Sequence, residues 1–406
     1  MATATVLALP SYYPAANEKI RVEGVYDSVG DFKPYQIPPG FPKQLHGPLV
    51  WTKESMMAQE EQWIIKLNDV EAEAIESALR FFQGTGLHIS KIDKKNFPLP
   101  EDLAQRLDNI SEECYNGRGF CIIRGMDPKR FLEEEHPVIY AGVTTYICPQ
   151  RGFQDYEKEQ VLCHLKNSAP YIDRNKIVSP GFTDGAMAFH TDLGDILSLY
   201  VIDQAPRGGR SLLASSWQVY NELAKVKPQV LHTLSHNWTF DTFREYAPFT
   251  RPLLHQQDGK VIFQCSRRPF TGFGPMVRSP ELPPITPAQI DALDSVHYYA
   301  AKNAIVLDIK PGDIMYINNM SILHGRESYE HAFDDEADGK KGWHKEGERH
   351  LLKFFLRDPK RAWNMPPALQ ALWQSIYGPN RSDGTREETW VLKTVPGMIH
   401  RWQVNG

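Results

Sequence analysis

The tripeptide His190-Thr191-Asp192 places an imidazole and a carboxylate two residues apart. On an extended strand, residues i and i+2 project from the same face, so these two side chains can reach one metal ion. Such a pair is weak by itself, because chance alone predicts between one and two His-x-Asp/Glu pairs in this composition and the sequence contains two. The second pair, His344 and Glu346, lies in a strongly polar stretch where no rigid element would hold a metal. The first pair is therefore the better candidate.

A third candidate ligand, His324, follows a strand pattern late in the chain. The turn Pro311-Gly312-Asp313 precedes the apolar run at residues 314–317, and a short connection leads to His324. A late strand could bring His324 back beside His190. Two histidines and one carboxylate occupy one face of an octahedron and leave three positions open. That arrangement suits an iron(II) ion that must hold a chelating cosubstrate and O₂ together.

The segment of residues 349–357 has strand periodicity with charge on one side. One face is mostly apolar, whereas the opposite face carries Arg349, Lys353 and Arg357. Burying such a cation without a partner costs several kcal/mol, so an interior position would require an anionic ligand. A dicarboxylate cosubstrate is such a ligand, and arginine offers it a bidentate fork. An edge strand whose charged face meets water explains the pattern equally well, and both interpretations stay open on the residues alone.

The elements around these residues indicate a β core with helices packed outside it. The first fifty residues are rich in proline, glycine and tyrosine and predict an extended arm on the surface. Apolar spacing and helix start signals predict helices at residues 56–82, 101–115, 217–223 and 290–301. Strands are predicted at residues 119–125, 196–202, 260–266, 304–309, 314–317 and 350–357.

Charge and cysteine usage narrow the class of protein. The net charge is −5 and is spread along the chain, so we expect a small-molecule substrate and neither a nucleic acid nor a membrane as partner. The apolar run before Pro10 is too short for a signal peptide or a membrane span. The five scattered cysteines contain no Cys-x-x-Cys pair and fit a reducing compartment. These features predict a soluble cytoplasmic enzyme and are compatible with a homo-oligomer.

An ordered set of motifs resembles the taurine/2,4-D dioxygenase-like (TauD/TfdA) family, over roughly residues 116–363. The first hundred residues show no such resemblance. The motifs, in chain order, are Gly117–Gly125, His190-Thr191-Asp192, Gly208-Gly209-Arg210-Ser211, Pro311-Gly312-Asp313, Asn319, His324-Gly325-Arg326 and Arg349-His350-Leu351.

This resemblance implies a mainly β fold with α elements (α+β): a distorted double-stranded β-helix, related to the jelly roll, with helices outside and an N-terminal extension. We expect residues 1–100 to form an arm and helical extension, residues 101–380 the oxygenase domain, and residues 381–406 a tail packed on it.

The resemblance also implies the site and its chemistry. His190, Asp192 and His324 would be the iron(II) ligands, and Arg349, helped by the Ser211 hydroxyl, would bind the distal carboxylate of 2-oxoglutarate. The implied reaction uses O₂ and couples oxidation of a substrate C–H bond to decarboxylation of 2-oxoglutarate to succinate and CO₂.

Residues for substrate recognition are less sharply indicated. Taurine-specific members carry a second arginine four residues after the first, where this chain has Lys353, which argues against taurine. Arg267, Arg268 and Phe270 lie between the metal motifs and could hold an anionic or aromatic substrate. The alternative, which we favour, is a turn whose arginines bind loop carbonyls and whose phenylalanine fills the core. The polar stretch at residues 330–348 predicts a surface loop, and its position after His324 would suit a lid.

Three functional hypotheses follow. The first is an iron(II)/2-oxoglutarate dioxygenase acting on a small polar metabolite, amino-acid-like or an intermediate of secondary metabolism. The second is a metal-dependent enzyme on the same fold that does not use 2-oxoglutarate, against which Arg349 and Ser211 argue. The third is a non-catalytic ligand-binding descendant, which would have no physical need for a complete ligand set together with Arg349.

Overall fold

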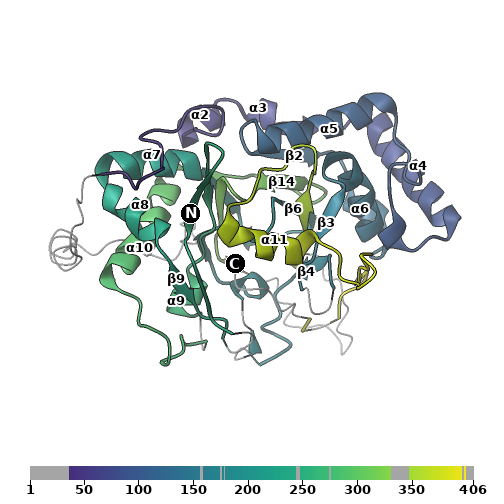
Figure 1. Ribbon diagram of the computed structural model, residues 1–406. Helices are drawn as coiled ribbons and strands as arrows, with labels where there is room; N and C mark the ends of the chain where they lie inside the picture. Colours follow the sequence, from purple (N-terminus) through teal and green to yellow (C-terminus); the bar gives the residue numbers. More distant parts are fainter. Residues whose placement is uncertain are drawn as a thin grey trace, which may run out of the picture.

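The core consists of two β-sheets with helices on either side (Figure 1). The computed structural model describes residues 36–155, 159–173, 176–177, 179–243, 247–273, 276–330, 347–395 and 397–398. The larger sheet has the order β1-β2-β14-β6-β17-β3, with β4 also paired to β17, and the smaller sheet has the order β13-β8-β15-β5. All pairs within these sheets are antiparallel except β1 with β2.

The first four strands belong to the larger sheet, and from β5 onward the strands pass back and forth between the two sheets, as in a double-stranded β-helix. The larger sheet contains β1 (Ile64–Lys66), β2 (Phe120–Arg124), β3 (Gln150–Gly152), β4 (Cys163–Leu165), β6 (Ile196–Asp203), β14 (Ile314–Asn318) and β17 (His350–Arg357). The smaller sheet contains β5 (Met187–His190), β8 (Ser211–Ser215), β13 (Ile305–Val306) and β15 (Ile322–Arg326). Within the described ranges the two sheets do not join into a closed barrel.

Three further strand pairs lie outside these sheets. They are β9 (Trp238–Phe240) with β10 (Phe249–Arg251), β11 (Leu254–Gln257) with β12 (Lys260–Phe263), and β7 (Arg207–Gly208) with β16 (Tyr329–Glu330).

Helices cover the sheets in two groups, which Figure 1 shows on opposite sides of the molecule. One group contains α4 (Asp69–Thr85), α5 (Glu101–Tyr115) and α6 (Glu135–Ile147), and α5 contacts β2 and β14 of the larger sheet. The other contains α7 (Ser216–Val226), α8 (Pro228–Ser235) and α10 (Pro287–Asn303), and α10 contacts β5 and β8 of the smaller sheet. The remaining helices are α2 (Lys53–Met57), α3 (Glu60–Trp63), α9 (Arg268–Thr271) and α11 (Pro367–Tyr377).

Local signals in the sequence account for several of these boundaries. Thr286 caps α10 through a capping box with Gln289, and Asn68 caps α4 in the same way. Helix α4 ends at Gly86, whose φ of +66° is a left-handed conformation that glycine adopts without a steric penalty. No helix in the described part of the chain is long and apolar enough to cross a bilayer.

Most of the predicted helices and strands are present, but several begin or end at other residues than predicted. The helix predicted at 101–115 and the strand predicted at 350–357 have the bounds of α5 and β17. The strand predicted at 304–309 is only β13, two residues long, and the one predicted at 260–266 ends at Phe263 as β12. The division into residues 1–100, 101–380 and 381–406 stays a prediction, and within the first of these segments β1 extends the larger sheet.

Two helical glycines give opposite predictions for stability. A Cβ at Gly142 in α6 would lie 2.5 Å from the ring of Phe97, whereas a Cβ at Gly84 in α4 would meet nothing within 4 Å. We expect Gly142→Ala to lower the free energy of unfolding by about 1–3 kcal/mol, because the core would be overpacked. Gly84→Ala should raise it by about 0.5–1 kcal/mol, because the unfolded chain loses freedom. Urea denaturation measures both, and a Gly142→Ala protein as stable as the wild type would contradict this account of α6 packing.

Candidate metal centre and cosubstrate pocket

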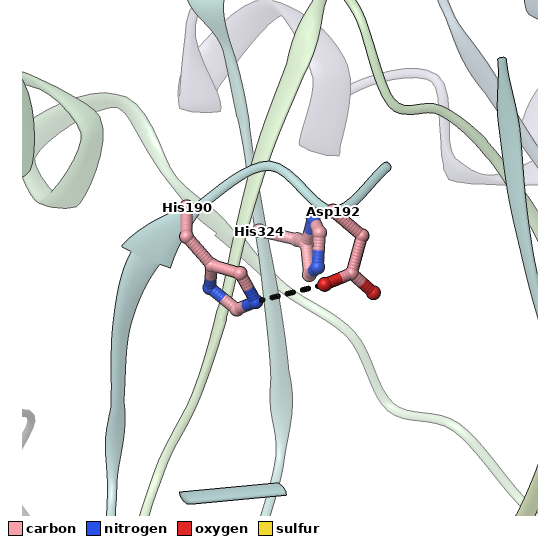
Figure 2. A group of neighbouring side chains, drawn as sticks. All are labelled: His190, Asp192 and His324. Atoms are coloured by element: carbon pink, nitrogen blue, oxygen red, sulfur yellow. Dashed lines mark ion pairs between the residues drawn. The ribbon is translucent and has the colours of Figure 1, made fainter. Parts of the chain in front are cut away.

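His190, Asp192 and His324 lie together where β5 meets β15. The two strands pair antiparallel with His324 opposite His190, and each of the three residues offers a ligand atom within 4.8 Å of the others (Figure 2). Strand β5 ends at His190, so Asp192 reaches the group from the turn that follows and not from the strand itself. This is the only candidate metal-binding group found among the residues that the structure describes.

The hydrogen bonds of the two histidines fit a bound cation. The Nδ1 of His190 lies 2.9 Å from the carbonyl of Ala188 and donates to it, which leaves the lone pair of Nε2 free. That Nε2 lies 3.7 Å from Oδ1 of Asp192, so two acceptors face each other with no proton between them. The Nδ1 of His324 is buried and has no hydrogen-bond partner in the described part of the chain. A divalent metal such as iron(II) would satisfy these atoms.

The electrostatics favour the protonation states that a metal needs. Burial lowers the pKa of His190, and burial together with His190 lowers the pKa of His324 to about 3, so both rings are neutral near pH 7. Burial by itself would raise the pKa of Asp192, but the charge of the Lys353 ammonium and its hydrogen bond outweigh burial and hold that pKa below its usual value. Neutral imidazoles and an ionised carboxylate are the ligand forms that bind divalent ions.

A cavity between the two sheets opens next to these residues. Its walls are mostly apolar, and its polar atoms come from the candidate ligands, two serines and three cations. The lining residues are Leu165, Ser179, Gly181, Met187, His190, Asp192, Leu197, Leu199, Ser211, Leu213, Ile317, His324, Gly325, Arg326, Arg349 and Lys353.

Arg349 is a buried cation of this cavity, only 6% exposed. It forms no ion pair with any carboxylate among the described residues, and burial lowers the pKa of its guanidinium. Its side chain lies over Gly209, whose φ is +71°, and a Cβ there would lie 3.4 Å from the Arg349 Cδ. The ring of Tyr329 lies 5.6 Å from the Arg349 guanidinium. A buried guanidinium without a carboxylate partner is unfavourable, and an anionic ligand would stabilise it.

Ser211 lies at the same end of the cavity. It begins β8, is 7% exposed, and pairs in register with Arg326 of the neighbouring β15. Arg326 is buried as well, and it donates hydrogen bonds to the carbonyls of Pro180, Thr183 and Gly185, so it holds the segment that leads into β5.

Lys353 faces the metal site. Its Nζ lies 2.9 Å from Oδ2 of Asp192, and both side chains are almost fully buried. The face of β17 that carries Arg349 and Lys353 therefore points into the molecule, as a buried strand with an anionic partner requires, and is not the solvent-exposed edge. Sequence reasoning did not find the contact with Asp192, although the i, i+4 spacing of the cations indicated that both share one face.

Arg267, Arg268 and Phe270 do not line this cavity. Arg267 pairs with Asp294 at 2.6 Å, and Phe270 packs against Trp238 with ring centroids 4.8 Å apart. Arg268 is buried at the start of α9. Phe270 thus fills the core as the favoured alternative expected, but Arg268 and Phe270 lie in the short helix α9 and not in a turn, and Arg267 pairs with a carboxylate and not with a loop carbonyl. A substrate role for the three residues stays a prediction. The polar stretch proposed as a lid lies, for residues 331–346, outside the described residues.

Comparison with known proteins places the chain in a family. Residues 82–352 match the model of the taurine catabolism dioxygenase TauD, TfdA family. A taurine hydroxylase-like protein, SAT17, of Stachybotrys chartarum is 33% identical over 332 residues, which cover 80% of this chain and 83% of that protein. FR-33289 synthase of Streptomyces rubellomurinus is 23% identical over 323 residues, which cover 77% of this chain and 90% of that protein.

Solved structures agree in fold. Asparagine oxygenase in complex with Fe(II), 2S,3S-3-hydroxyasparagine and succinate superposes with a TM-score of 0.52 at 14% identity, covering 78% of this chain and 98% of that chain. The non-heme iron oxygenase OrfP in complex with Fe, succinate and (3S)-hydroxy-L-Arg superposes with a TM-score of 0.51 at 13% identity, covering 75% and 98%.

The fold and the site therefore define an iron(II)- and 2-oxoglutarate-dependent dioxygenase, and the predicted double-stranded β-helix fold is confirmed. The chain belongs to the taurine catabolism dioxygenase TauD, TfdA family.

The Lys353–Asp192 ion pair predicts a large loss of stability on truncation. Lys353→Ala leaves the Asp192 carboxylate buried without its ammonium, which costs about 3–5 kcal/mol of unfolding free energy in the metal-free protein. Arg207→Ala is the control, because Arg207 pairs with Glu330 and the two side chains are 54% and 47% exposed, and such a surface pair contributes about 1 kcal/mol or less. Urea denaturation of both variants tests this prediction. Equal losses of unfolding free energy would show that the buried pair contributes no more to stability than a surface pair.

Proposed function

We propose that His190, Asp192 and His324 hold iron(II) and that Arg349 and Ser211 bind the distal carboxylate of 2-oxoglutarate. The enzyme then oxidises an unactivated C–H bond of a small polar metabolite, amino-acid-like or an intermediate of secondary metabolism. The observation that carries this proposal is the cavity itself, in which three mutually close ligand atoms and a buried arginine share one apolar enclosure.

Each residue has a definite physical task in this proposal. The Arg349 guanidinium offers a carboxylate two parallel N–H donors, and the Ser211 hydroxyl offers a further donor at the same end of the cavity. With the distal end fixed, the keto acid end of the cosubstrate is directed toward the ligand group. The leucines of the cavity wall exclude water from the reacting region. When bound, iron(II) and 2-oxoglutarate supply the oxidising power from O₂, with succinate and CO₂ as the other products.

The substrate class is supported by two observations. The structures of asparagine oxygenase and OrfP contain hydroxylated amino acids, and both proteins share this fold. Lys353, at the position where the taurine-specific members carry a second arginine, contacts Asp192, so we propose a substrate other than taurine. An enzyme that does not use 2-oxoglutarate, or a non-catalytic binding protein, is not favoured, because the ligand group and Arg349 occur together.

The cellular setting is also a proposal. The five cysteines are all buried as free thiols, which supports the cytoplasmic, reducing location expected from their spacing. A homo-oligomeric state stays a prediction.

The cosubstrate assignment has a direct spectroscopic test. An anaerobic titration of the metal-free protein with iron(II) and then 2-oxoglutarate should produce a weak visible charge-transfer band only when both are present. Half-maximal intensity of this band in Arg349→Ala should require at least about 30-fold more 2-oxoglutarate. Truncating one partner of a buried charge pair costs about 2 kcal/mol or more, which corresponds to that factor. Arg207→Ala, at an ion pair with Glu330 in which both side chains are exposed, should behave as the wild type.

Two outcomes of this titration would overturn the assignment. Iron binding without the band would favour a metal-dependent enzyme that does not use 2-oxoglutarate. A protein that binds no iron would favour the non-catalytic descendant.

A further inference from the structure

Asn319 is fully buried in the connection between β14 and β15, and its side chain contacts the metal motif. Its Oδ1 accepts a hydrogen bond from the backbone N–H of Asp192 at 2.8 Å, and its Nδ2 donates to the carbonyl of Leu193 at 2.9 Å. Its own backbone N–H donates to the carbonyl of Asp195 at 2.8 Å. One residue thus binds the backbone of the turn that carries Asp192 at three points.

These bonds matter because no strand holds Asp192. Strand β5 ends at His190, so ladder hydrogen bonds fix the first histidine but not the carboxylate two residues later. The position of the Asp192 side chain therefore depends on the backbone of the turn and on the Lys353 ammonium, which binds its Oδ2. A primary amide both accepts and donates from one planar group, and neither a carboxylate nor an aliphatic side chain of similar size can do both.

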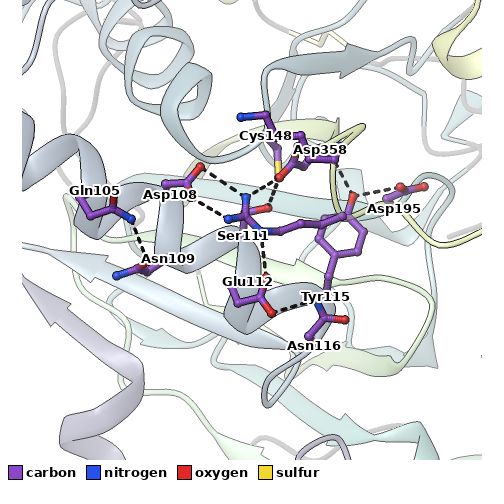
Figure 3. Close-up of polar contacts among 12 residues, drawn as sticks. Gln105, Asp108, Asn109, Ser111, Glu112, Tyr115, Asn116, Cys148, Asp195 and Asp358 are labelled. Atoms are coloured by element: carbon purple, nitrogen blue, oxygen red, sulfur yellow. Dashed lines mark hydrogen bonds and ion pairs between the residues drawn. The ribbon is translucent and has the colours of Figure 1, made fainter.

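The far end of the same turn is fixed independently. The Asp195 carboxylate accepts a hydrogen bond from the hydroxyl of Tyr115 at 2.9 Å (Figure 3) and another from the indole of Trp373. Gly194 has a φ of +85°, and a Cβ there would lie 2.6 Å from the hydroxyl of Tyr377. With this end anchored, Asp192 itself is held by Asn319 at its backbone N–H, by Gln264 at its carbonyl and by Lys353 at its carboxylate.

We propose that Asn319 is a positioning residue that fixes the Asp192 carboxylate for metal binding without itself being a ligand. This inference rests on the proposed function in that Asp192 is taken as an iron ligand. Partners that orient metal ligands set metal affinity, and their loss lowers it by roughly 10–100-fold.

The neighbouring residue supplies a matched control. Asn318 is also fully buried, but its Nδ2 donates to the carbonyl of Cys114 at the end of α5, and its Oδ1 accepts from the N–H of Met320. Neither bond reaches the metal motif. Asn318 and Asn319 thus lose comparable buried hydrogen bonds on substitution but differ in what those bonds hold.

The test compares Asn319→Leu with Asn318→Leu in the full chain. Both should lower the midpoint of thermal unfolding, because both leave buried backbone groups unsatisfied. Anaerobic calorimetry with iron(II) alone should show roughly 10–100-fold weaker binding for Asn319→Leu. Asn318→Leu should stay within about twofold of the wild type, as expected for a site with no shared partner. The affinity for 2-oxoglutarate at saturating iron should change in neither variant, because Arg349 and Ser211 are untouched.

The outcomes separate this inference from the proposed function. Iron binding that is equally tight in the two leucine variants, or equally weakened in both, overturns the positioning role of Asn319 and leaves the metal assignment intact. A wild-type protein that binds no iron overturns both. If a leucine variant does not fold, Asn319→Ala and Asn318→Ala carry the same comparison, because each removes the whole amide group and adds neither bulk nor charge.

Discussion

The antiparallel pairing of β5 with β15 sets His324 opposite His190, and the geometry of the whole site depends on it. Strand β15 pairs on its other side with β8, where Arg326 lies opposite Ser211. A single central strand thus aligns His190 on one side and Ser211 on the other, and all of these residues line the cavity. Because side chains alternate along a strand, a register slip of one residue would turn His324 out of the cavity.

Charge balance in the cavity is the second constraint, and β17 provides it. Lys353 of β17 and Arg349, which directly precedes the strand, both line the cavity, yet they have different surroundings. Lys353 donates to Asp192, so its charge is compensated within the protein. Arg349 has no carboxylate partner in the described part of the chain and lies beside Tyr329 and Gly209. The cavity that the candidate metal ligands line therefore also contains a buried guanidinium suited to an anionic ligand.

The sequence predicts helices and strands whose pattern of apolar residues is clear, and it misses those without such a pattern. Helix α5 was predictable because its polar and apolar residues lie on two faces, and strand β17 because it is a short run rich in leucine and phenylalanine. Helix α6 was not, because every one of its residues is buried and it has no polar face. The pairing of β5 with β15 could not be derived from spacing, because the intervening chain is long and register is set by tertiary contacts.

The same distinction applies to the site. Residue types and spacing pointed to His190, Asp192, His324 and Arg349, but not to what each would contact. Lys353 shows the difference: its i+4 position after Arg349 places it in the cavity, yet its partner is the carboxylate of Asp192 rather than a substrate anion. A lysine ammonium is a compact point charge that can bind one carboxylate oxygen and leave the other to a metal. In this chain we therefore expect substrate selection to come from the apolar wall of the cavity and its neighbouring loops.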